Sequence, residues 1–104
     1  MKEARVDALK SMLELNPNDG FALYGLALEY KADGLLEEEL PLLERAATLE
    51  DPLLYTFYQL GEVLLGLGED SEAAEALRTG LDRARTAGDM KALNEFEALL
   101  AMVE

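Results

Sequence analysis

The chain has 104 residues, half of them hydrophobic, and it carries 22 acidic against 9 basic residues, for a formal net charge of −13. This length and composition predict one folded domain rather than a disordered tail, and the acidity disfavours a nucleic-acid partner, because phosphate backbones attract Lys and Arg. The sequence has neither Cys nor His, which excludes zinc sites made of thiolate and imidazole, thiol nucleophiles and imidazole bases.

Apolar residues recur at intervals of three and four along the chain, which is the spacing of one face of an α-helix. The spacing predicts six helices. Five of them span about Glu3–Leu15, about Phe21–Ala32, from near Glu39 to Leu49, about Pro52–Leu67 and about Met90–Val103. The other, fifth in chain order, is capped by Asp70 or Ser71 and stops at Gly88. No segment has the pattern of a strand. The predicted fold class is therefore all-α.

Glycine, proline and aspartate mark the ends of these helices. We expect stops at Gly34, Gly68 and Gly88, the first in a left-handed conformation, and caps from Asn18 or Asp19, Asp51, Asp70 or Ser71, and Asp89. Pro52 fits a first helical position. Pro41 lacks the amide that a helix begun at Leu36 would use there. The third helix should therefore either be kinked or begin near Glu39, and we favour the later start.

The sequence nearly repeats itself after 34 residues. Gly34 and Gly68 are in register, and around them Leu26 matches Leu60 and Leu43 matches Leu77. A fixed period of this size, written in helix-forming residues, is typical of stacked helical hairpins. Such arrays build extended surfaces rather than pockets, so the pattern favours binding over catalysis.

The repeated residues resemble tetratricopeptide repeats (TPR), which pair two antiparallel helices in each unit. The first unit matches at Leu23, Leu26, Ala27, Tyr30, Gly34, Leu43 and Ala46, with Pro52 one residue late, and the second matches at Phe57, Leu60, Gly61, Gly68, Ala73 and Leu77. The resemblance covers nearly the whole chain, and it departs from the family at Glu39, where Ala is usually buried. It implies a short right-handed α-α superhelix of about six helices in a single TPR-like domain, residues 1–104. The domain would consist of a half-repeat helix (1–17), repeat one (19–52), repeat two (53–87) and a terminal helix (89–104).

The family's ligand surface is the concave face formed by the first helix of each unit. Carried over to this chain, that face would present Phe21, Tyr24, Leu28, Lys31, Tyr55, Tyr58, Gln59 and Glu62. Its aromatic side chains suit peptide recognition, although the terminal helices or a second subunit could instead cover them. The family's clamp of Lys and Asn for a peptide carboxylate is missing, because Tyr24 and Leu28 stand at the first two clamp positions. We therefore expect a basic or apolar partner segment.

The sequence thus predicts a protein–protein interaction module, a scaffold or adaptor, and not an enzyme. No cofactor or metal ion is expected. The alternative is a self-assembling structural protein whose aromatic face or C-terminal helix forms a homo-oligomer interface. The last helix is unusually apolar for a cap, and Leu99 and Met102 lie partly aside from its packed stripe.

No apolar run approaches the length of a membrane span, and the first residues lack the apolar core of a secretory signal. We therefore expect a cytoplasmic protein without a membrane partner.

Overall fold

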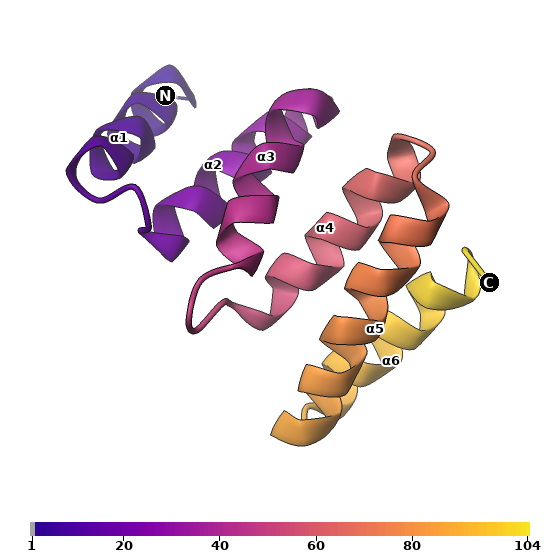
Figure 1. Ribbon diagram of the computed structural model, residues 1–104. Helices are drawn as coiled ribbons and strands as arrows, with labels where there is room; N and C mark the ends of the chain where they lie inside the picture. Colours follow the sequence, from indigo (N-terminus) through magenta and orange to yellow (C-terminus); the bar gives the residue numbers. More distant parts are fainter. Residues whose placement is uncertain (1) are drawn as a thin grey trace. The chain divides into compact units, whose positions relative to one another are not determined.

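The computed structural model describes residues 2–104, and this part of the chain is all-α, as predicted (Figure 1). The helices are α1 (Lys2–Leu15), α2 (Gly20–Ala32), α3 (Leu36–Ala47), α4 (Leu54–Gly66), α5 (Asp70–Ala87) and α6 (Met90–Ala101). Residues 2–104 contain no strand. None of the helices in this range is both long and apolar enough to traverse a bilayer.

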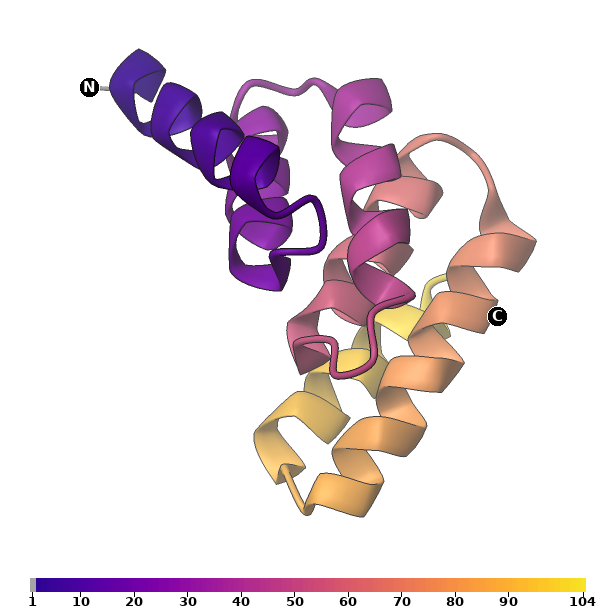
Figure 2. The same cartoon turned by 60° about the vertical axis from the view of Figure 1, so that its left-hand side comes forward.

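The chain divides into two compact units, Met1–Leu53 and Leu54–Glu104. The first unit holds α1, α2 and α3, and the second holds α4, α5 and α6. Within the first unit α2 packs against both α1 and α3, and within the second α5 packs against both α4 and α6 (Figures 1 and 2). The division into repeats and the right-handed superhelix stay predictions.

The first unit is held together by apolar side chains from all three helices. Leu9 of α1 packs with Ala22 and Leu26 of α2, and partly buried apolar residues surround this cluster, namely Val6, Met12, Leu13, Tyr30 and Leu42. A Cβ atom at Gly25 would lie 3.2 Å from Leu9 Cδ2, so α1 approaches α2 closely at this glycine. The loop between α1 and α2 is also bonded to α3, because Arg45 Nη2 donates a hydrogen bond of 2.5 Å to the carbonyl of Pro17.

Two glycines allow the helices of the second unit to pack tightly. A Cβ at Gly61 of α4 would lie 2.4 Å from Leu77 Cδ2 of α5. One at Gly80 of α5 would lie 2.2 Å from Phe96 Cε1 of α6 and 2.9 Å from Phe57 Cβ of α4. Phe96 and Leu77 have no exposed surface. The large side chains therefore fill space that only glycine leaves open, as the close packing of helices requires.

Three helices end at a glycine in the left-handed conformation, at Gly34 (φ 72°), Gly68 (φ 80°) and Gly88 (φ 70°). After α2 the amide of Leu35 donates a hydrogen bond of 3.0 Å to the carbonyl of Tyr30. The amide of Gly34 donates one of 2.9 Å to the carbonyl of Lys31. The same pair of bonds recurs after α4 and α5. This is the Schellman arrangement, and it confirms all three predicted stops.

Replacing Gly34 by alanine is expected to destabilise the chain by about 1 kcal/mol, because a Cβ disfavours the left-handed conformation. No atom lies within 4 Å of the added Cβ, so conformational strain alone should set the cost. Gly34→Asn should cost less, since asparagine tolerates this region better. Urea denaturation of the three proteins tests the order, and equal stability of the alanine variant and the parent would contradict it.

Two of the predicted N-caps are confirmed and two are wrong. Asp19 accepts a hydrogen bond of 3.1 Å from the amide of Ala22, and Asp89 accepts one of 3.0 Å from Ala92. The cap position of α5 is Glu69, which forms no side-chain cap bond. Helix α4 begins at Leu54, which leaves Asp51 and Pro52 in the connection. The Schellman turn explains why neither Asp70 nor Ser71 caps α5, because the last residue of the turn, Glu69, already occupies the cap position.

The predicted late start of the third helix is also wrong, because α3 begins at Leu36 and contains Pro41. The ring of Pro41 removes one helical hydrogen bond, the one that would reach the carbonyl of Glu37. Glu37 and Pro41 are both exposed, so water can hydrate this carbonyl. Glu39 faces the other way, and its side chain is only 1% exposed.

Candidate functional site

The predicted partner-binding residues of the first unit form one row along α2. Phe21, Tyr24, Leu28 and Lys31 are spaced three or four residues apart, which places them on one side of the helix. The residues of α2 that are buried, Ala22, Leu23, Leu26 and Ala27, lie on the other side. Phe21 is 68% exposed and Leu28 36% exposed, whereas Tyr24 and Lys31 are partly buried. We call these four residues the α2 row.

The remaining predicted residues, Tyr55, Tyr58, Gln59 and Glu62, form a similar row on α4, and all four are partly buried. We call them the α4 row. Its two aromatic rings contact α6. The centroid of the Phe96 ring lies 6.3 Å from that of Tyr55 and 5.7 Å from that of Tyr58. The hydroxyl of Tyr55 donates a hydrogen bond to Glu95 Oε1. Within the second unit, the terminal helix thus covers part of the α4 row, which is the alternative that the sequence left open.

The terminal helix α6 is packed more completely than its composition indicated. Leu99 and Leu100 are each 9% exposed, whereas Met90 is 63% and Met102 75% exposed. The prediction that a residue lies aside from the packed stripe is confirmed for Met102 and wrong for Leu99. The exposed large apolar side chains of α6 and its C-cap are thus those of Met90 and Met102, at its two ends.

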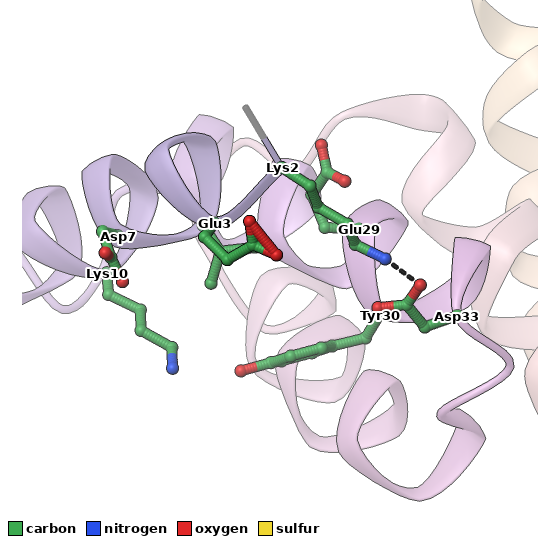
Figure 3. A pocket seen from close by; sticks show the side chains of 8 residues that line it. Lys2, Glu3, Asp7, Lys10, Glu29, Tyr30 and Asp33 are labelled. Atoms are coloured by element: carbon green, nitrogen blue, oxygen red, sulfur yellow. Dashed lines mark ion pairs between the residues drawn. The ribbon is translucent and has the colours of Figure 1, made fainter.

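A hollow of about 560 Å³ lies in the first unit between α1 and α2, and sequence reasoning missed it. Its lining consists of Lys2, Glu3, Val6, Asp7 and Lys10 from α1, and Glu29, Tyr30 and Asp33 from α2. Figure 3 shows the Tyr30 side chain extending from α2 below α1, with Lys10 extending to the same side. The one signal in the sequence was the placement of Glu3, Asp7 and Lys10 four and three residues apart, on one face of α1.

Part of the charge around this hollow is paired. Lys2 Nζ forms an ion pair with Asp33 Oδ1 (Figure 3), and Arg5 Nε lies 2.9 Å from Glu29 Oε1. Among residues 2–104, Glu3, Asp7 and Lys10 form no ion pair. Four carboxylates and two ammonium groups line the hollow. Negative charge therefore predominates beside the Tyr30 ring.

Two smaller hollows belong to the second unit. One, of about 360 Å³, adjoins Arg83, whose guanidinium carbon lies 4.9 Å from the centroid of the Phe57 ring. The other, of about 230 Å³, surrounds an ion pair between Arg78 and Glu104. Arg83 thus stacks on Phe57, and Arg78 is paired with Glu104. The hollow of the first unit has the largest volume of the three and is the stronger candidate.

The chain matches no model of a known protein family, and it matches no curated protein.

Proposed function

We propose that the chain is a TPR-like interaction module that binds a protein or peptide segment reversibly, with no bond formed or broken. The residues proposed to contact a partner, as the resemblance implies, are the α2 row in the first unit and the α4 row in the second. The partner segment is basic or apolar, because the chain carries a net charge of −13 and its two rows contain only one cation, Lys31. Its acidic surface would steer a basic partner during encounter.

The observation that carries this proposal is the exposure of Phe21 and Leu28. Both are large apolar residues on the side of α2 opposite its buried residues. They lie about two helical turns apart with the partly buried Tyr24 between them in the α2 row, and apolar side chains that share one exposed face are typical of interaction sites. Phe21 also offers a large, rigid contact area at a low entropic cost.

The double variant Phe21→Ala/Leu28→Ala is expected to weaken partner binding at least about tenfold, because interface anchors commonly contribute more than 1 kcal/mol each. Its helix content should be unchanged, since both side chains are already exposed. The measurement is a quantitative pull-down with the purified chain as bait, followed by titration of the captured protein against both forms.

Leu15→Ala is the matched control, because Leu15 is 90% exposed in the same unit and lies outside the α2 row. It should bind like the parent. Equal binding by the double variant and the control would place the site elsewhere on the chain.

The alternative, a homo-oligomer formed through α6 or the aromatic face, has less support. Leu99, Leu100 and Phe96 of α6 are already buried, and the rings of the α4 row pack against Phe96. Sedimentation at several concentrations separates the two functions. A mass that rises with concentration would favour self-assembly.

A further inference from the structure

The hollow between α1 and α2 is a second candidate site, independent of the proposed function because none of its lining residues belongs to the α2 row or the α4 row. We propose that it binds an arginine side chain from a basic segment of another protein. Its volume, about 560 Å³, is within the range of sites that enclose a small ligand. A single guanidinium group and its aliphatic stem would occupy only part of it.

Two carboxylates on α1 supply the attraction. Glu3 and Asp7 lie one helical turn apart and form no ion pair among residues 2–104. Like charges at this spacing repel each other, so a cation placed between them relieves repulsion as well as gaining attraction. A guanidinium group presents several donors in a planar fork, and it can therefore bond to two carboxylates at once.

The lining also suits the rest of an arginine side chain. Val6 and Tyr30 provide apolar surface for the stem, and both pack against the buried cluster of Leu9, Ala22 and Leu26, which holds them in place. The Tyr30 ring offers a face on which the guanidinium can stack. Arginine is favoured over lysine for this reason and for its planar fork.

Two of the four acidic side chains are already neutralised. Asp33 pairs with Lys2 and Glu29 with Arg5, so Glu3 and Asp7 are the two lining carboxylates outside these pairs. Lys10 lines the hollow and has no ion-pair partner among residues 2–104. Its charge opposes an incoming cation. This gives the proposal a second, opposite test, because removal of the Lys10 charge should strengthen binding.

The experiment uses the full chain labelled with ¹⁵N and titrated with acetyl-Gly-Arg-Gly-amide, with the citrulline peptide as the neutral counterpart. We expect shift changes at the amides of Glu3, Asp7 and Tyr30 with the arginine peptide and none with the citrulline peptide. Glu3→Gln/Asp7→Asn should raise the Kd about two- to fivefold, the range of exposed ion pairs, and Lys10→Gln should lower it about twofold. Spermidine is titrated in parallel at equal charge concentration.

The control variant is Glu14→Gln/Glu44→Gln, which removes the same charge from exposed positions of the first unit that do not line the hollow. It should change the Kd by less than the Glu3 and Asp7 substitutions. Equal weakening by both pairs, or equal shifts with the citrulline peptide, would overturn the proposal. A stronger response to spermidine would also overturn it, because the occupant would then be a free polyamine and not a protein segment.

Discussion

Replacing Phe96 by alanine is expected to destabilise the second unit by about 3–5 kcal/mol, the usual cost of removing a fully buried aromatic side chain. Phe96 has no exposed surface and lies against Gly80 of α5. Its ring also pairs with those of Tyr55 and Tyr58 on α4. One substitution thus removes apolar contacts that α6 makes with both other helices of its unit. A loss of this size is a large part of the stability of a typical domain.

The measurement is urea denaturation followed by circular dichroism, together with amide hydrogen exchange of α6. In the Phe96→Ala variant we expect the amides of α6 to exchange faster than in the parent, and those of α2, which lies in the first unit, to change less. Met90→Ala is the control, because Met90 lies on the same helix and is 63% exposed. If both variants lost equal stability, Phe96 would not be the residue that docks α6.

The second large effect is expected for Gly80→Ala. The added Cβ would lie 2.2 Å from Phe96 Cε1 and 2.9 Å from Phe57 Cβ. The Phe96 ring is fully buried, and the Phe57 Cβ is fixed to the backbone of α4, so neither atom can move away freely. Overpacking of this kind costs about 1–3 kcal/mol, which exceeds the gain of up to about 1 kcal/mol from replacing glycine with alanine inside a helix.

Gly20→Ala is the matched control for this clash. At Gly20 the nearest atom to an added Cβ is Leu49 Cδ1, a terminal methyl group at 3.1 Å, which a small rotation moves away. The double variant Gly80→Ala/Phe96→Leu should lose less stability than the two single changes added together, because the shorter side chain leaves room for the new methyl group. Strict additivity in a denaturation cycle would show that the two residues do not compete for the same space.

Much of the fold follows from short-range signals in the sequence. The positions of Gly34, Gly68 and Gly88 mark helix ends, because a left-handed residue is local chemistry that glycine alone satisfies at low cost. Asp19 and Asp89 are recognisable as caps for the same reason, since each bonds to an amide only three residues away. The all-α class follows from the spacing of apolar residues, which needs no knowledge of the partner helix.

Features that depend on distant contacts were not predictable in the same way. Tyr55 and Glu95 are 40 residues apart, and nothing in either helix alone shows that α6 contacts the rings of the α4 row. The early start of α3 was missed because the cost of Pro41 depends on solvent access to one carbonyl. The hollow was missed because it requires residues of α1 and α2 to meet. The placement of Glu3 and Asp7 on one face was the only part of it visible in advance.

Site-specific photo-cross-linking inside cells tests most directly whether the α2 row, with its exposed Phe21 and Leu28, contacts a protein partner. A photoreactive phenylalanine derivative is placed at position 28 in one chain and at position 15 in another, two positions that are both exposed in the first unit. We predict a cross-linked product with a different protein from position 28 and none from position 15. Products from position 15 alone, or products that contain only two copies of this chain, would contradict the account.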